Sequence, residues 1–319
     1  MQIAISENTF ALIDAIPDGV VKALEPVLSS REIVKTMHDC REDSAALFHQ
    51  FGIKLECVAD TQVSNLLIQR QTKIPLHQLA YSDLLHRYLG QPMRESTDMK
   101  QKMLDDPFLW HRRPLPGELV KYALHGVEFL KPLFERMQAE LEILNVSKAD
   151  VMDASSKWME YRELNANLGT KEVEKIGAPL LGMVASINDR GVYFKLNLAR
   201  TGVCTTPSAL KRMLNGSGGF PPVQVGDIVE LAVSGISLDG KVLYVDRLDP
   251  DWEYFDFLRR PHPGKRGTSV QEYRHNPSIV EHADIDPLLR RGLGPDGTID
   301  SDDEGEIDHE TILTRKPRK

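Results

Sequence analysis

The chain has 319 residues, of which 41% are hydrophobic and 27% charged, and its formal net charge is −8. This balance is typical of a soluble globular protein with room for two modest domains, and it argues against a surface coated in basic residues. Cys40, Cys57 and Cys204 lie far apart in the sequence, so they predict neither a zinc motif nor a disulfide framework.

The sequence gives no sign of a membrane segment. No apolar run reaches the roughly 18 to 20 residues that span a bilayer, and the first residues lack the pattern of a secretory signal. The cysteine usage fits a reducing compartment. We therefore expect a cytoplasmic or nuclear protein without a membrane partner.

Residues 1–165 alternate short apolar runs with amphipathic stretches, which predicts an α/β layered domain. The expected strands cover 3–5, 10–13, 34–37 and 55–58, with a turn at 7–9. The expected helices cover 20–28, 43–51 (opened by Asp43 and ended by Gly52), a stretch capped by Asp60, 76–89 (ended by Gly90), 113–130 and 133–144.

Residues 175–248 change character, with β-branched and aromatic runs separated by glycines. Five such runs (GMVASIN, GVYFKL, TGVCT, DIVELAVSGIS and KVLYVDR) and one helical piece, SALKRM, predict an all-β OB-type barrel. From about residue 250 the periodicity is lost, and an acidic run at 300–310 precedes a basic end, so we expect 250–319 to be mostly disordered. Such a tail is either a solvated end or a partner-binding segment.

The helix expected over 113–130 carries an odd residue on its inward stripe. Leu119, Tyr122, Ala123 and Gly126 recur at three- and four-residue steps, so they share one face. A glycine inside a helix costs roughly 1 kcal/mol relative to alanine. The presence of glycine at position 126 therefore needs an explanation other than helix stability.

Three segments in order carry a resemblance to a known family: IVKTMHDCREDSAALFHQFGIKL (33–55), CVADTQVSNLL (57–67) and FLWHRRPLPGELVKYALHGVEFLKPL (108–133). They resemble the ribonuclease D branch of the DEDD-family 3'-5' exonucleases, including eukaryotic exonuclease-domain proteins of small-RNA pathways and Egalitarian-like proteins. The resemblance implies a ribonuclease H-like fold. It also implies phosphodiester hydrolysis by two Mg²⁺ or Mn²⁺ ions held by four carboxylates.

The catalytic residues of that family carry over poorly. Asp43 matches the second acidic motif and Tyr122 the water-positioning tyrosine, but Gly126 stands where the last metal-binding aspartate belongs. The first acidic motif has no counterpart, so we expect an N-terminally truncated version of the domain, or a rearranged sheet. One carboxylate of four cannot neutralise two dications, which predicts a degenerate domain without a cofactor; Asp43 is a metal ligand only in an active enzyme. Helix capping and core packing are the alternative roles of Asp43 and Tyr122.

Residues 178–248 resemble an S-one-type RNA-binding domain, through GMVASINDRGVYFKL, TGVCTTPSALKRM and VQVGDIVELAVSGI. The resemblance implies that aromatic and basic side chains on the barrel contact single-stranded RNA. The implied residues are Arg190, Tyr193, Lys195, Thr205, Lys211 and Arg212, with Tyr193 as an exposed aromatic and Lys195 on the same face. Packing at a surface or interface is the other role open to Tyr193.

Two functions follow from these resemblances. The first is a binding protein, in which a catalytically degenerate exonuclease-like domain accompanies a barrel that binds single-stranded RNA, or alternatively DNA. The second is an active metal-dependent 3'-5' exonuclease acting on RNA, whose first acidic motif is missing only from this version of the sequence. A homodimer through the exonuclease-like domain is a further expectation, and protein scaffolding without RNA is a third possibility.

Overall fold

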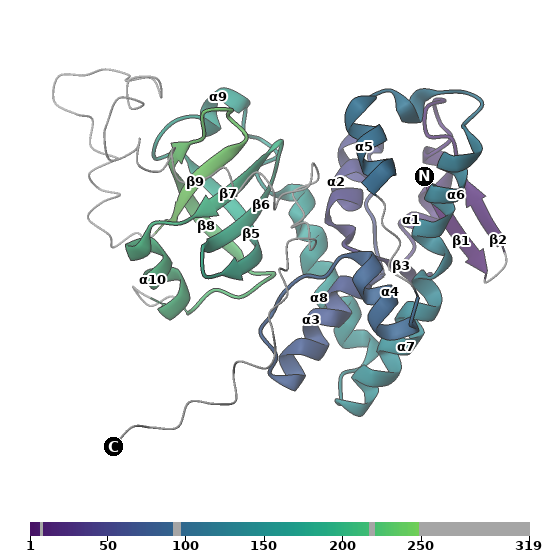
Figure 1. Cartoon of the computed structure of the whole chain (residues 1–319), viewed down its shortest axis with the longest axis horizontal. Helices are drawn as coiled ribbons and strands as arrows, with labels where there is room; N and C mark the ends of the chain where they lie inside the picture. Colours follow the sequence, from purple (N-terminus) through teal and green to yellow (C-terminus); the bar gives the residue numbers. More distant parts are fainter. Residues whose placement is uncertain (7–8, 92–96, 217–220, 249–319) are drawn as a thin grey trace.

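The computed structural model describes residues 1–6, 9–91, 97–216 and 221–248. Figure 1 shows two parts side by side: an N-terminal part rich in helices and a barrel. The turn expected at 7–9 falls mainly outside the described residues, as does the tail expected over 250–319. No described helix combines the length and the apolar character that a bilayer crossing requires.

The N-terminal part holds short strands among helices. In chain order its elements are β1 (Gln2–Ser6), β2 (Thr9–Leu12), η1 (Lys22–Leu24), α1 (Glu25–Leu28), β3 (Lys35–Met37), α2 (Cys40–Phe51), β4 (Val58–Asp60), α3 (Thr61–Thr72), α4 (Tyr81–Leu89), α5 (Thr97–Asp105), η2 (Leu109–His111), α6 (Gly117–Glu128), α7 (Leu130–Ile143), α8 (Lys148–Met159), η3 (Glu160–Glu163) and α9 (Thr170–Val173). Strands β1 and β2 form an antiparallel hairpin, and β3 pairs with β4 in parallel. Within the described strands, these remain two separate two-stranded sheets.

The barrel confirms the five strands expected from the sequence. Its elements are β5 (Pro179–Asn188), β6 (Gly191–Leu198), β7 (Arg200–Cys204), α10 (Pro207–Asn215), β8 (Ile228–Ile236) and β9 (Val242–Arg247). The closed order is β5-β6-β7-β9-β8, with β7 and β9 parallel and the other pairs antiparallel. The expected helix lies between the third and fourth strands.

Several expected boundaries move for local reasons. The stretch 20–28 forms a 3-10 turn and a four-residue helix instead of one helix, because Pro26 lacks an amide hydrogen and suits only a first turn. The strand expected over 55–58 begins at Val58, and the helix expected over 76–89 begins at Tyr81. The predicted stops are confirmed, since Gly52 and Gly90 both adopt the left-handed conformation that ends helices.

One hydrophobic cluster runs through both parts of the molecule. It joins Leu47 and Ile53 of the N-terminal part to Met183, Phe194 and Leu231 of the barrel. The expected core position of Phe194 is thereby confirmed. A second cluster, which includes Ile68, Leu84, Leu133, Met137 and Leu141, lies beneath α3, α4 and α7. The barrel is thus packed onto the N-terminal part through a shared core.

A glycine allows a close approach between the two parts. Gly226 has a φ of +93°, and a Cβ built there would lie 2.9 Å from Nε1 of Trp158 on α8. A side chain at 226 would therefore face both backbone strain and a collision with the indole ring. Trp158 is 4% exposed, so this contact belongs to the core.

Two glycines in ordinary backbone conformations should respond oppositely to alanine. A methyl at Gly191 would lie 2.6 Å from the carbonyl oxygen of Cys204, whereas one at Gly126 meets only Nε2 of Gln2, at 3.6 Å. We expect Gly191→Ala to lower the free energy of unfolding by about 1–3 kcal/mol through overpacking. Gly126→Ala should raise it by up to about 1 kcal/mol through helix propensity. Urea denaturation measures both, and equal effects would contradict the packing described for the barrel.

Candidate functional site

A cleft of about 1440 Å³ opens between the β1–β2 hairpin, α6 and the barrel strands β5 and β6. The polar and aromatic side chains that line it belong to Gln2, Asp14, His38, Asp39, Glu42, Gln62, Gln78, Tyr81, Ser82, Lys102, Trp110, His111, Arg113, Glu118, Lys121, Tyr122, His125, Ser186 and Lys195. Its walls therefore come from both parts of the chain.

The buried carboxylate of Asp60 connects the starts of the two helices α2 and α3. It accepts hydrogen bonds from the backbone amides of Asp39 and Cys40, at 3.1 and 2.6 Å, and from those of Gln62 and Val63, at 2.7 and 3.4 Å. It thus caps α3, as the sequence predicts, and also holds the start of α2. This second role explains why α2 begins at Cys40, three residues before the expected Asp43.

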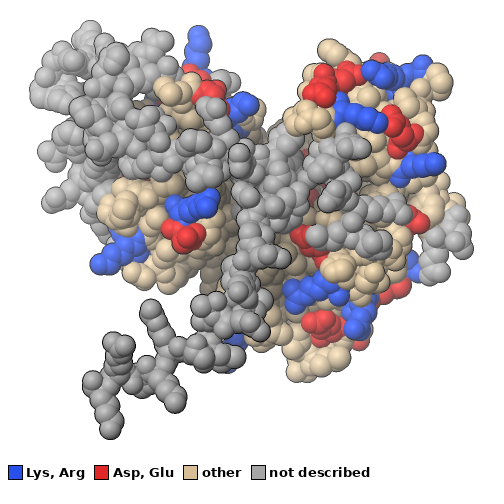
Figure 2. Space-filling model, in the orientation of Figure 1, with Lys and Arg blue, Asp and Glu red and all other residues tan. Residues whose placement is uncertain are grey.

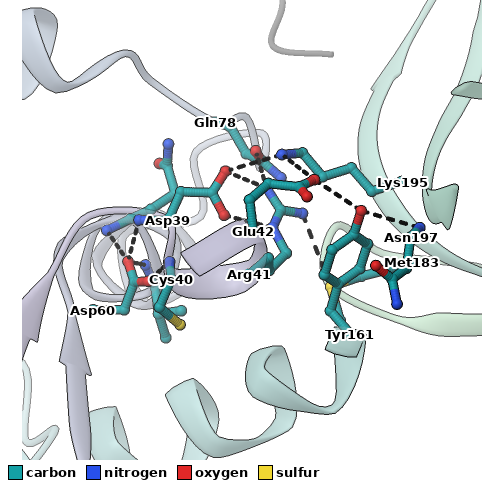
Figure 3. Close-up of polar contacts among 12 residues, drawn as sticks. Asp39, Cys40, Arg41, Glu42, Asp60, Gln78, Tyr161, Met183, Lys195 and Asn197 are labelled. Atoms are coloured by element: carbon teal, nitrogen blue, oxygen red, sulfur yellow. Dashed lines mark hydrogen bonds and ion pairs between the residues drawn. The ribbon is translucent and has the colours of Figure 1, made fainter. Parts of the chain in front are cut away.

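The guanidinium of Arg41 is fully buried where the two parts meet (Figure 3). It donates to both carboxylate oxygens of Asp39, at 2.6 and 2.8 Å, and to Oε1 of Gln78 at 2.8 Å. Its Nη1 lies 3.9 Å from the sulfur of Met183 in the barrel, and its charge lies 4.1 Å above the ring of Trp158. Although burial opposes ionisation, the Arg41 charge holds the pKa of Asp39 well below its usual range.

Lys195 of β6 reaches across to the same carboxylate. Its Nζ lies 3.4 Å from Oδ2 of Asp39 and 3.4 Å from Oε1 of Glu42. Glu42 also accepts a 2.8 Å hydrogen bond from the hydroxyl of Tyr161, which itself accepts one from the amide of Asn197 at 3.0 Å. Figure 3 shows this chain of contacts bridging α2, η3 and β6.

Each carboxylate that lines the cleft has a cationic partner. Asp14 pairs with Arg113, whose hydrogen bond lowers the pKa of Asp14 to about 2, and Glu118 pairs with Lys102 at 2.7 Å. Asp39 and Glu42 are held by Arg41 and Lys195, as described above. Within the described residues, no three His, Cys, Asp or Glu side chains are grouped so that they could hold a metal ion. This donor set does not fit the pair of dications that the family resemblance implies.

The three motif positions of the N-terminal part do not assemble into a metal site. Tyr122 and Gly126 both line the cleft on α6, and Tyr122 is 37% exposed, so the alternative of core packing is wrong for this side chain. Asp43 lies in the first turn of α2, is exposed, and is not part of the cleft wall. Although part of the residue is exposed, desolvation of its carboxylate by the surrounding protein, followed by the negative charges of Asp39 and Asp60, raises the pKa of Asp43 to about 6.

The two central residues of the expected RNA face on the barrel are buried. Tyr193 is 5% exposed and the Lys195 side chain 7%, so the expectation of an exposed aromatic with a free lysine beside it is wrong. The physical reason for Lys195 is that its face of β6 is docked against α2. Lys211 is exposed on α10 and Arg212 half-buried there, while Arg190 is exposed in the turn before β6.

The remaining expected barrel residue, Thr205, lies near that turn. A Cβ at Gly191 would meet the Thr205 methyl at 3.3 Å, which places Thr205 beside the residue that follows Arg190. Tyr193 pairs with Val203 on β7, whereas Lys195 points toward Asp39. The structure thus separates the six expected residues into an outer group and a docked one.

Sequence reasoning missed Arg41 and Trp110. Arg41 lies in the segment DCRED, where a basic residue among acids has the appearance of a solvated helix start. Trp110 lies in WHRR, an aromatic residue beside basic ones, which is a usable signal for nucleic-acid contact. Neither signal specifies burial or the direction in which the side chain points.

We expect Arg41→Met to lower the free energy of unfolding by about 3–5 kcal/mol, because Asp39 loses its main partner in a buried setting. The double variant Arg41→Met with Asp39→Asn should recover part of that loss, since no charge remains without its partner. Thermal and urea unfolding measure both variants. A single variant as stable as the wild type would contradict the central role of this ion pair.

The raised pKa of Asp43 predicts a pH dependence of stability. The folded state binds this proton more tightly than the unfolded chain, so the contribution is present below pH 4 and lost as the pH rises to about 6. Asp43→Asn should therefore be the more stable protein at pH 7 by up to about 1 kcal/mol, since solvent screens an exposed carboxylate. The difference from wild type should vanish near pH 3.5, and an equal gain at both pH values would refute this account.

Comparison with known proteins identifies relatives of the N-terminal part. Residues 1–142 match a family model described as 3'-5' exonuclease. Ribonuclease D of Nitrobacter hamburgensis is 28% identical over 138 residues, which cover 43% of this chain and 33% of that protein. The piRNA biogenesis protein EXD1 of Mus musculus is 32% identical over 116 residues, which cover 34% of this chain and 20% of that protein.

A solved structure of Trypanosoma brucei RNase D is also similar, with 29% identity and a TM-score of 0.40 over 46% of this chain and 50% of that one. The matched region spans a third or less of the length of the two curated relatives above. The N-terminal part of this chain is therefore a 3'-5' exonuclease-like domain related to ribonuclease D and to EXD1.

Proposed function

We propose that this chain binds single-stranded RNA in the cleft between its two parts and does not hydrolyse it. One observation carries the proposal. The carboxylates of the cleft wall are each paired with a lysine or arginine, while aromatic rings and one further cation, Lys121, line the same space. Such a surface suits an anion with stacking bases better than it suits two metal ions.

The case against hydrolysis rests on charge. Two dications need several unpaired carboxylate oxygens at one place, and position 126 provides none. Asp39, a neighbouring carboxylate, is held by Arg41 at 2.6 Å and by Lys195 at 3.4 Å. A metal ion there would have to displace two cations before it reached its ligand.

The case for RNA combines the relatives with the barrel. A ribonuclease and a piRNA biogenesis protein are named for work that involves RNA. The closed five-stranded barrel with its single helix supports the S-one-type resemblance, and in the proposal the exposed Arg190 and Lys211 and the half-buried Thr205 contact further nucleotides. Lys195 instead contributes to the cleft wall from its docked position.

The alternative function is a metal-dependent 3'-5' exonuclease that uses Asp43 and Tyr122. It would need additional carboxylates beyond those that the described residues bring together. The two functions differ in one direct measurement, the length of an RNA after incubation with the protein.

The full chain should retain a 5'-labelled single-stranded RNA without shortening it in Mg²⁺ or Mn²⁺. Binding should weaken steadily as salt rises, because phosphate contacts release counterions. Denaturing gels and filter binding measure the two properties, with the same RNA in duplex form as the specificity control. Stepwise loss of 3' nucleotides that disappears in Asp43→Asn would overturn the non-catalytic proposal, and no retention even at low salt would favour scaffolding.

A further inference from the structure

Trp110 and Tyr122 form a continuous aromatic wall in the cleft. Their ring centroids are 6.3 Å apart and the planes are tilted by 46°. Trp110 comes from η2 and Tyr122 from α6, and both line the cleft. Tyr122 is 37% exposed, whereas Tyr193 of the barrel is 5% exposed, so the accessible ring surface lies on the N-terminal part.

The wall is held from behind by buried and paired groups. Leu109, next to Trp110, is 5% exposed, and Leu119, one turn before Tyr122, is fully buried. Arg113 donates a 2.9 Å hydrogen bond to the carbonyl oxygen of Trp110 while pairing with Asp14 beyond β2. These contacts hold the backbone segments that carry the two rings before any ligand arrives, which reduces the ordering cost of binding.

The space in front of Tyr122 is open on the side of Gly126. A Cβ at position 126 would meet only Nε2 of Gln2, at 3.6 Å. Lys121, the neighbour of Tyr122, is exposed and lines the cleft, as does the exposed Lys102, which pairs with Glu118. A nucleobase at this wall would therefore contact aromatic rings, and it would lie near an uncrowded backbone and lysine side chains.

We infer that Trp110 and Tyr122 are a base-stacking site for single-stranded RNA, an inference that rests on the function proposed above. Figure 2 shows Lys and Arg interspersed with Asp and Glu over the visible face of both parts, without one continuous basic stripe. The described residues on that face thus offer no single basic track for phosphates, and the proposal gives the stacked bases a share of the affinity. Each stacked base contributes enough to change affinity by about 5- to 150-fold.

The test measures the affinity of the full chain for a single-stranded oligouridine by fluorescence anisotropy. Trp110→Ala and Tyr122→Ala should each weaken binding by about 5- to 150-fold. Tyr122→Phe keeps the ring and should bind as the wild type does. Phe108→Ala is the matched control, because Phe108 is a 71% exposed aromatic beside the same 3-10 turn and is not part of the cleft wall.

An abasic oligonucleotide with the same number of phosphates separates stacking from charge. It should bind the wild type more weakly than the oligouridine does, and Trp110→Ala should not weaken it further. If the wild type retains no RNA, the proposed function fails. If it retains RNA but both alanine variants bind as tightly as Phe108→Ala does, the stacking site is wrong while the proposed function stands.

Photo-crosslinking of the unmodified chain tests the stacking site even if an alanine variant fails to fold. A 4-thiouridine oligonucleotide irradiated with the unmodified chain should attach to peptides that contain Trp110 or Tyr122, as read by mass spectrometry. Crosslinks confined to barrel peptides around Arg190 or Lys211 would overturn the site and place the bases on the barrel.

Discussion

The pairing of Arg41 with Asp39 sets the geometry on which the rest of this molecule depends. A fully buried guanidinium needs a carboxylate and further hydrogen-bond acceptors, and this one finds them in Asp39, Gln78 and Met183. Met183 belongs to the barrel and Asp39 to the start of α2, so the contacts of this one charge span both parts and add to the hydrophobic core that the parts share. The cleft exists where the two parts then leave space beside β6.

The polar contacts between the two parts change which residues of the barrel remain accessible to a ligand. Its strand β6 presents Lys195 to Asp39 and Glu42, and Asn197 to Tyr161. Lys195 would face solvent on an isolated barrel, but here it contacts the N-terminal part. The RNA contacts that we propose therefore involve the N-terminal wall of the cleft and the exposed barrel residues Arg190 and Lys211.

Local signals in the sequence predicted much of the fold. The helix stops at Gly52 and Gly90, the cap at Asp60 and the five barrel strands each depend on a few neighbouring residues, so a pattern can reveal them. Such a pattern could not predict the burial of Tyr193 and Lys195. Alternation along a strand indicates which side a residue takes, and it says nothing of what packs there. The same limit concealed Arg41, whose acidic neighbours in sequence suggested a solvated surface.

In the proposed function, the glycine at position 126 bears on both metal binding and base stacking. A carboxylate there would place negative charge one helical turn from Tyr122, where it would repel the phosphate that accompanies a stacked base. With glycine, the positive charge of Lys121 is not opposed from position 126, and the ring of Tyr122 stays accessible. On the proposed function, a glycine at this position therefore disfavours dications and favours a polyanion, and both effects follow from the absence of one negative charge at position 126.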